Sequence, residues 1–395
     1  MNETPPLETA NNLWQQGHFS AAAAIYRHLV QENSHLVEGF LHLGKLALWQ
    51  NQFAEAEQWL QKTINLVPDD SEPMSLLAEL FYRQDQFWKA APFFRRGGRE
   101  AQADKLASFR EKRPYHLEGA TDTIHIPFLQ TDPLPLLAAK LNGQPVHLLL
   151  DTGASELIID PAMAEQIGVT KFGAEGATFA GGKQASYEHG RLDSLSLGDW
   201  TIQNLPVHLL DTSRFTTVTG GVPVHGIIGT VLFYHFLATI DYPQNQLTLR
   251  RPSAHADEVD QEVASIPFWL VGDHLMMAWG TMNQSEPLLM LVDTGLAGGG
   301  FLCPQSTLEV ANIAPPSDGS FTGEGGGGQV TAVPFNIEQL TLGDTAVQNV
   351  VGIYGPFPPS LEHGLGFHVG GLISHGFFRS FALTFDFNKM RLILN

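Results

Sequence analysis

The sequence predicts a multidomain protein in which an N-terminal all-α helical repeat precedes an all-β region of two pseudo-twofold-related halves. Three observations support this fold class. Residues 10–100 contain an internal repeat, and after residue 113 the chain changes to short apolar runs separated by Gly, Pro, Asn and Asp. The third observation is a duplication inside that second region. We therefore expect three domains, at residues 1–113, 114–254 and 255–395.

The helical repeat has a period of 34 residues. An aromatic residue, an alanine and a large apolar residue recur at this spacing, and the three sets are Phe19, Phe53 and Phe87; Ala22, Ala56 and Ala90; and Tyr26, Leu60 and Phe94. This pattern resembles tetratricopeptide repeats. The resemblance implies that the alanine lies where the two helices of a hairpin approach closely and that the aromatic residue fills the space between neighbouring hairpins. Residues 99–112 are predicted to form a closing helix over the last apolar face.

The sequence leaves two functions open for the repeats. One is a concave groove that binds a peptide or a partner protein, and the other is a scaffold or dimerisation surface packed on the next domain. No cluster of basic residues suited to a carboxylate terminus is evident in the repeat sequence. We also expect Pro92 to kink the second helix of the third repeat, because proline removes a backbone donor.

Charge is distributed unevenly along the chain. Residues 1–115 carry 12 Lys and Arg against 14 Asp and Glu, whereas residues 116–395 carry 10 against 27. Such an acidic second region argues against nucleic acid or an anionic membrane as a partner, and it favours cationic substrates, work at low pH or simple solubility. Cys303 is the single cysteine, which excludes an intramolecular disulfide and cysteine-based zinc motifs. The sequence predicts no cofactor and no metal site.

The sequence shows neither an export signal nor a membrane span. The first residues lack both a basic start and an apolar core, which favours the cytoplasm, and a periplasmic location stays open if a leader precedes them. The uncharged stretch 215–240 is long enough to cross a bilayer. We expect no span there, because Pro223, His225 and several glycines interrupt it.

Two short motifs organise the β region. Residues 148–155 read Leu-Leu-Leu-Asp-Thr-Gly-Ala-Ser, and residues 289–295 read Leu-Met-Leu-Val-Asp-Thr-Gly. Each places an aspartate, Asp151 or Asp293, at the end of a buried strand. A buried carboxylate costs several kcal/mol unless it is paired, hydrogen-bonded or protonated. One copy alone would suggest a capped turn, whereas two copies predict carboxyl groups that face each other and share one proton.

The duplication extends well beyond these two turns. If the copies pack about a twofold axis, as in a C2 dimer, the same turn from each half reaches the axis and the carboxyl groups become neighbours. An acidic linker around residues 257–260 joins the halves. The matching positions are residues 126–128 and 266–268, residues 197–199 and 342–344, Gly226 and Gly371, Thr239 and Thr384, and Asp241 and Asp386.

These motifs resemble those of aspartic peptidases, pepsin-like and retropepsin-like, in which Asp-Thr/Ser-Gly-Ala/Thr-Ser/Thr follows a hydrophobic strand. The first copy matches at five positions, and the second matches at three before departing at Leu296 and Ala297. The family's hydrophobic-hydrophobic-Gly strand behind the catalytic turn corresponds to residues 227–229. In the second half Ser374 replaces the glycine, and we expect it to crowd the loop that holds Asp293. Short halves without disulfides favour a fused retropepsin-like pair.

The resemblance implies the site residues. Asp151 and Asp293 would form the catalytic pair, and Thr152 and Thr294 would tie the two turns together across the axis. The residues expected to support the turns are Thr152, Gly153, Ser155, Thr294 and Gly295. Glycine-bearing stretches about thirty residues beyond each aspartate would form flaps over the substrate. The residues assigned to these flaps are Phe179, Gly181, Gly182, Gly325 and Gly326. A surface loop is the alternative for the second stretch, and a phosphate loop is excluded because no Gly-Lys-Ser/Thr follows.

The activity implied by the resemblance is an aspartic endopeptidase with a peptide or protein substrate. One carboxylate of the Asp151 and Asp293 pair would take a proton from a bound water while the other donates to the substrate carbonyl. Ser155 is expected to hydrogen-bond the outer oxygen of Asp151, and Ala297 cannot do the same for Asp293. The sequence therefore predicts that Asp293 is the more readily protonated member.

An alternative is a catalytically weak or inactive peptide-binding protein on the same fold, with the repeats as its docking arm. Ala297, Ser374 and the absence of a tyrosine at the first flap tip favour this alternative. A third class is an assembly scaffold in which the halves pack only for structure. Retention of both Asp-Thr-Gly turns argues against that class.

Overall fold

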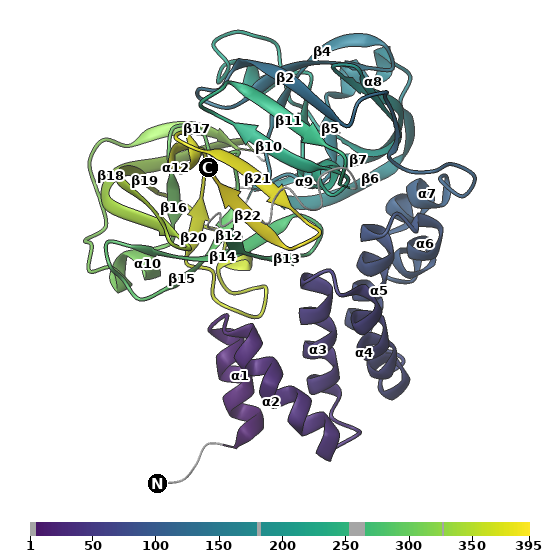
Figure 1. The fold of residues 1–395 in the computed structure, drawn as a ribbon, viewed down its shortest axis with the longest axis vertical. Coiled ribbons are helices and arrows are strands. Elements are labelled where there is room, and N and C mark those ends of the chain that lie inside the picture. Colours follow the sequence, from purple (N-terminus) through teal and green to yellow (C-terminus); the bar gives the residue numbers. More distant parts are fainter. Residues whose placement is uncertain (1–4, 180–182, 253–264, 326–327) are drawn as a thin grey trace.

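The computed structural model describes residues 5–179, 183–252, 265–325 and 328–395. Helices from the N-terminal third lie on one side of a larger β region made of two parts (Figure 1). The expected domain boundary at 254/255 and the acidic linker at 257–260 lie outside the described residues. In the described part of the chain, no helix is both long enough and apolar enough to cross a membrane.

Seven helices form the described N-terminal region, and each packs against the next along the chain. Their bounds are α1 Pro6–Gln15, α2 Phe19–Glu32, α3 Val37–Trp49, α4 Phe53–Leu66, α5 Ser71–Arg83, α6 Phe87–Arg96 and α7 Glu100–Ala107. The recurring alanines Ala22, Ala56 and Ala90 are fully buried, as close helix approach requires. Gly44 also allows two helices to approach closely, because a side chain there would overlap Leu60. The repeat predicted from a 34-residue period is therefore a set of packed helical hairpins.

The closing helix is shorter than predicted. It is α7, which ends at Ala107, and turns follow it as far as Lys112. The first strand begins at His116. Pro92 lies inside α6, and the helix continues beyond it to Arg96.

The two halves have nearly the same order of elements. In the first half the elements are β1 His116–Glu118, β2 Thr123–Gln130, β3 Leu136–Leu141, β4 Gln144–Leu150, β5 Leu157–Ile159, α8 Pro161–Gln166, β6 Thr170–Phe179, β7 Lys183–Leu197, β8 Trp200–Leu209, η2 Ser213–Thr216, β9 Gly226–Ile228, α9 Thr230–Phe233, β10 Leu237–Asp241 and β11 Gln246–Arg250. In the second they are β12 Ser265–Pro267, β13 Trp269–Val271, β14 Leu275–Met282, β15 Leu288–Val292, β16 Phe301–Cys303, α10 Gln305–Val310, β17 Phe321–Gly325, β18 Gly328–Leu342, β19 Thr345–Tyr354, α11 Pro359–Glu362, β20 Gly371–Ile373, α12 His375–Phe378, β21 Ala382–Asp386 and β22 Arg391–Leu394. Among the residues that the structure describes, β1 occurs only in the first half, and β2 corresponds to the two strands β12 and β13 of the second.

Strand pairing repeats between the halves. Parallel pairs β4–β9 and β15–β20 are equivalent, and so are the parallel pairs β5–β8 and β16–β19. The halves meet where β10 pairs antiparallel with β21, and there Thr239 lies opposite Thr384. Their hydroxyl oxygens are 2.7 Å apart. Since these two threonines are also equivalent in the duplication, each meets its own counterpart, which occurs only on a twofold axis.

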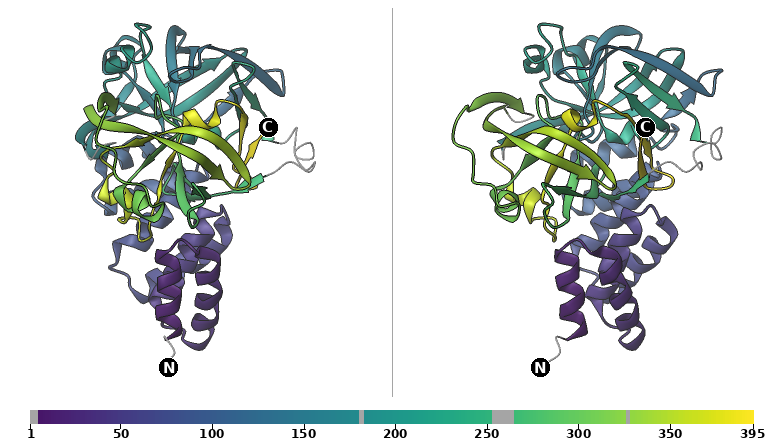
Figure 2. Two further views of the ribbon diagram at one scale, coloured as in Figure 1. Left: turned by 90° about the vertical axis from the view of Figure 1, so that its left-hand side faces the viewer. Right: turned by 60° about the vertical axis from the view of Figure 1, so that its left-hand side comes forward.

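The helical repeats pack tightly against the β region. The Phe19 ring of α2 lies 5.2 Å from that of Trp269 and 5.0 Å from that of Phe367, both in the second half. Backbone contacts reinforce this packing, because the His368 amide donates to the Gln15 carbonyl at 2.9 Å. The side views show the helices projecting from the β region (Figure 2). The repeats therefore share an apolar core with the second half.

Candidate active site

Each expected catalytic aspartate stands at the end of a buried parallel strand pair. The Asp151 amide donates to the Ile228 carbonyl at 3.1 Å, and the Asp293 amide donates to the Ile373 carbonyl at 3.0 Å. Strand β4 ends in residues 148–150, which are almost fully buried apolar side chains. Both aspartates are partly accessible, so the strand ends open toward solvent or a ligand.

The turn after each aspartate curls back onto its carboxyl group. The Gly153 amide donates to Asp151 Oδ1 at 2.8 Å, and the Gly295 amide donates to Asp293 Oδ1 at 2.7 Å. A side chain at Gly153 would overlap the Asp293 carboxyl group, and one at Gly295 would overlap that of Asp151. Glycine is therefore required at both positions because the opposite turn approaches so closely.

The two carboxyl groups face each other across the axis, because each lies against the glycine of the opposite turn. Two carboxylates held this close repel each other when both are ionised, which favours one proton on the pair. Burial raises the pKa of Asp151 well above its usual range, and repulsion from Asp293 adds to that increase. Burial also raises the pKa of Asp293, against the opposing effect of the Gly295 amide. Shared protonation is the state expected for two acids held this close.

Thr152 and Thr294 link the two turns across the axis. The Thr152 amide donates to the Thr294 hydroxyl oxygen at 3.1 Å, and the Thr294 amide donates to the Thr152 hydroxyl oxygen at 3.0 Å. Both side chains are fully buried. The Thr230 hydroxyl also donates to the Thr152 carbonyl at 2.7 Å. These reciprocal bonds fix the spacing of the catalytic pair.

Ser155 does not hydrogen-bond Asp151 as the sequence had suggested. Its hydroxyl donates instead to Asp273 Oδ2 at 2.7 Å, in the turn between β13 and β14. Against the cost of burial, this bond and His274 lower the pKa of Asp273 well below its usual range. The contact that was expected to make Asp293 the more readily protonated member is therefore absent.

Ser374 does not crowd the second catalytic loop. Its hydroxyl oxygen accepts a hydrogen bond from the Leu296 amide at 3.1 Å, which satisfies a half-buried donor. In the first half the equivalent Gly229 has no such freedom, because a side chain there would overlap the Ser155 carbonyl. The loop after Asp293 therefore follows a different path from the loop after Asp151, and this path leaves room for a serine side chain.

Both halves place an antiparallel hairpin where a flap was expected. Strands β6 and β7 pair up to Phe179 opposite Lys183, and β17 and β18 pair up to Gly325 opposite Gly328. The tip residues Gly181, Gly182 and Gly326 lie outside the described residues. The described glycines of the second stretch therefore lie at the end of a strand pair. The flap assignments in both halves remain predictions.

A buried ionic cluster next to the first catalytic loop was missed in the sequence. Glu156 directly follows Ser155 and is 1% exposed, and its two carboxylate oxygens lie 2.8 and 2.6 Å from Lys105 Nζ of α7. The Tyr82 hydroxyl of α5 donates to the same carboxylate at 2.7 Å. The available signal was a charged residue preceding the apolar residues 157–159. The helical repeats thus contact the chain one residue beyond the catalytic motif.

Two family models match the chain. The one described as aspartyl protease covers residues 137–232, and the one described as tetratricopeptide repeat covers residues 13–80. No curated protein matches. A crystal structure of a retropepsin-like aspartic protease from Rickettsia conorii matches with 18% sequence identity, covering 35% of this chain and 94% of that chain, with a TM-score of 0.23.

The chain therefore carries an aspartyl protease domain joined to tetratricopeptide repeats, and both resemblances predicted from the sequence are confirmed. The aspartyl protease match lies in the first half and contains Asp151. Asp293 lies outside it and is connected to it by the duplication and by the geometry of the two turns.

Proposed function

We propose that this protein is an aspartic endopeptidase that hydrolyses peptide bonds with a water activated between Asp151 and Asp293. The observation that supports this most strongly is the close approach of these two carboxyl groups, each of which lies against the glycine of the opposite, equivalent turn. The proposal assigns catalysis to the two halves, 114–254 and 255–395, and docking to residues 1–113.

The proposed reaction proceeds without a covalent intermediate. The ionised carboxylate takes a proton from water as the water oxygen attacks the peptide carbonyl carbon, and the protonated partner donates its proton to the carbonyl oxygen. A tetrahedral diol results. When it collapses, a proton passes to the leaving nitrogen and the C–N bond breaks, which leaves a carboxylic acid and an amine.

The hairpins would hold an extended peptide over the aspartates. Backbone groups at a hairpin edge can pair with a substrate strand, and closure of the tips would exclude bulk water. We assign this role to the two strand pairs that end at Phe179 and at Gly325, together with the tip residues Gly181, Gly182 and Gly326.

The helical repeats would dock a protein partner or part of the substrate. A pocket of about 360 Å³ lies between α6 and residues 109–114. Trp88 lines it and is 57% exposed, and the charged lining residues are the cations Arg110, Lys112 and Arg113 and the acids Asp85 and Glu111. This mixture of an aromatic ring and charges of both signs suits a charged peptide segment with an apolar anchor.

The test is cleavage of a mixed peptide library between pH 4 and 7. Asp151→Asn and Asp293→Asn are each expected to lower kcat at least about a hundredfold, because each removes a proton-transfer group. Asp199→Asn is the matched control, since Asp199 is exposed in the turn between β7 and β8. Equal cleavage by all four proteins would reveal a contaminant and contradict the proposal. Peptide binding without cleavage by the wild type would instead support the inactive peptide-binding protein.

A further inference from the structure

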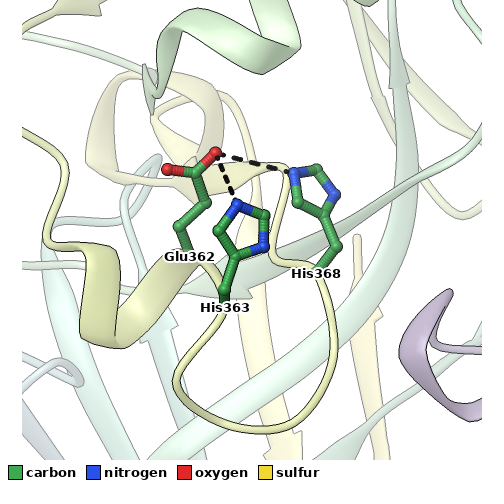
Figure 3. Close-up of side chains that lie close together, drawn as sticks. All are labelled: Glu362, His363 and His368. Atoms are coloured by element: carbon green, nitrogen blue, oxygen red, sulfur yellow. Dashed lines mark ion pairs between the residues drawn. The ribbon is translucent and has the colours of Figure 1, made fainter.

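Two histidines and a glutamate converge in the second half (Figure 3). Glu362 is the last residue of α11, His363 follows it directly, and His368 lies in the loop that leads to β20. One carboxylate oxygen and one ring nitrogen from each histidine all lie within 4.8 Å of one another. The sequence predicted no metal here, because only the folded loop returns His368 to its neighbours.

The spacing of these atoms is close to that of a metal site. Glu362 Oε1 lies 3.4 Å from His363 Nε2 and 3.8 Å from His368 Nε2. Two ligands at zinc distances of about 2.0–2.1 Å, set at the tetrahedral angle, are about 3.3 Å apart. The first pair already has this spacing, and the second needs a movement of about 0.5 Å.

The loop is held in shape by groups that leave the ligand atoms facing one another. The Val369 amide donates to the Glu362 carbonyl at 2.9 Å and closes the loop. The Ser306 hydroxyl donates to Glu362 Oε1 at 2.6 Å and lies 3.5 Å from His368 Nε2, so it orients the carboxylate as a supporting hydrogen bond does in known metal sites and contacts a second ligand atom. The His363 side chain is 64% exposed, so an ion can enter from solvent.

We propose that Glu362, His363 and His368 bind one divalent transition-metal ion of the zinc class, with water as the fourth ligand. Two imidazoles and one carboxylate suit Zn²⁺ and its neighbours in the first transition row. Mg²⁺ and Ca²⁺ prefer oxygen ligands alone and should bind weakly.

The bound ion fastens a loop on which the helical repeats rest. The His368 amide donates to the Gln15 carbonyl, and the neighbouring Phe367 ring lies 5.0 Å from that of Phe19 and 5.6 Å from that of Trp49. A ligand that binds only the folded loop stabilises the fold by linkage, so metal binding should also strengthen the contact between the repeats and the second half.

The experiment is a calorimetric titration of tag-free, chelator-treated full-length protein with ZnCl₂, together with the visible absorption of the Co²⁺ form. We expect one ion per chain, a tetrahedral Co²⁺ spectrum and a higher melting temperature with Zn²⁺. His363→Ala and His368→Ala should each weaken binding at least about tenfold. His28→Ala is the matched control, because His28 also faces a glutamate, Glu32, at 3.7 Å in an exposed pair, and it should bind zinc as the wild type does.

Three results would overturn the proposal: no saturable zinc binding, binding unchanged in both loop variants, or equal binding of Mg²⁺. Circular dichroism shows whether each variant is folded. If His368→Ala unfolds, the exposed His363→Ala variant decides the question, because its side chain supports little of the core.

Discussion

At the scale of single residues, the raised pKa values of Asp151 and Asp293 connect catalysis to stability. The folded pair binds its proton more tightly than the unfolded chain does, so this contribution to stability is largest at low pH. It is lost as the pH rises through the folded pKa. Holding the two carboxyl groups together therefore lowers the stability of the fold at neutral pH.

The Asp293→Asn variant should therefore be more stable than the wild type at pH 8, and the difference in stability should be smaller at pH 5. The amide can still donate a hydrogen bond to Asp151 but adds no charge. We expect a melting temperature a few degrees higher at pH 8, because about 1 kcal/mol corresponds to a few degrees. Asp199→Asn, at an exposed position, should show no such pH-dependent gain. A gain that is the same at both pH values would contradict the shared proton.

The threonine pair sets the separation of the two turns. Thr152→Val leaves the buried Thr294 amide without an acceptor, which costs about 1–3 kcal/mol, and it loosens the catalytic geometry. We expect lower stability in urea unfolding and a lower kcat. Thr152→Ser keeps the hydroxyl and should recover most of both properties. Equal losses in the serine and valine variants would show that packing of the methyl group matters and that the hydrogen bond does not.

Because Ser155 does not hydrogen-bond Asp151, the difference expected between Ser155 and Ala297 loses its basis. The Ser155 hydroxyl bonds Asp273 and not Asp151. A serine at position 297 therefore has no equivalent bond to restore at Asp293. Ala297→Ser should leave the acid limb of the pH–rate profile in place. A downward shift of that limb would support the original interpretation.

At the scale of elements, helix α7 connects the repeats to the active site. Lys105 pairs with Glu156 beside the first catalytic loop, and burial lowers the pKa of Lys105. Arg99, just before α7, pairs with Glu175 of β6 at 3.1 Å. One helix thus contacts both the catalytic loop and the hairpin expected to close over the substrate.

Lys105→Met should be strongly destabilising and should lower kcat. It leaves the Glu156 carboxylate buried without its cation, which costs about 3–5 kcal/mol. The double variant with Glu156→Gln removes that charge and should recover much of the loss in chemical unfolding. Lys171→Met is the control, because Lys171 and Glu188 form a surface pair 2.9 Å apart that should be worth about 1 kcal/mol or less. Similar costs for the two lysines would rule out a special role for the buried pair.

At the scale of the whole molecule, the repeats and the β region form one packed body. Phe19, Trp49 and Phe367 belong to one apolar cluster that also contains Leu289 and Leu372 of the second half. The repeats are therefore structural support for the second half, whatever they also bind. Two functions of the repeats were considered from the sequence, a binding groove and a scaffold packed on the next domain. These contacts fit the scaffold.

Phe19→Ala should destabilise helices and strands together. The cavity it leaves costs about 3–5 kcal/mol. Helical circular dichroism and hydrogen exchange in β13–β15 should report the same midpoint shift. Trp88→Ala, at an exposed aromatic position in the repeats, should shift neither signal. Melting of the helices alone would show that the repeats form an independent arm.

The sequence could predict features that appear as local patterns. It could not predict contacts between residues far apart in the chain. The 34-residue period and the two Asp-Thr-Gly turns are local patterns, and they identified the helical hairpins and the aspartate pair. Ser155 meets Asp273 across 118 residues, and Tyr82 meets Glu156 across 74. No local pattern encodes such contacts. Ser374 shows the same limit, because its effect depended on the path of the loop that it supports.

The central claim is that Asp151 and Asp293 hold one proton between them. The most direct measurement is a carbon NMR titration of the aspartate carboxyl groups in the wild type, with the two asparagine variants assigning the signals. Two coupled steps are predicted, with one apparent pKa well above the ordinary value of about 3.9, and a single step for the remaining aspartate in each variant. Independent titration of both groups near that ordinary value would contradict the account.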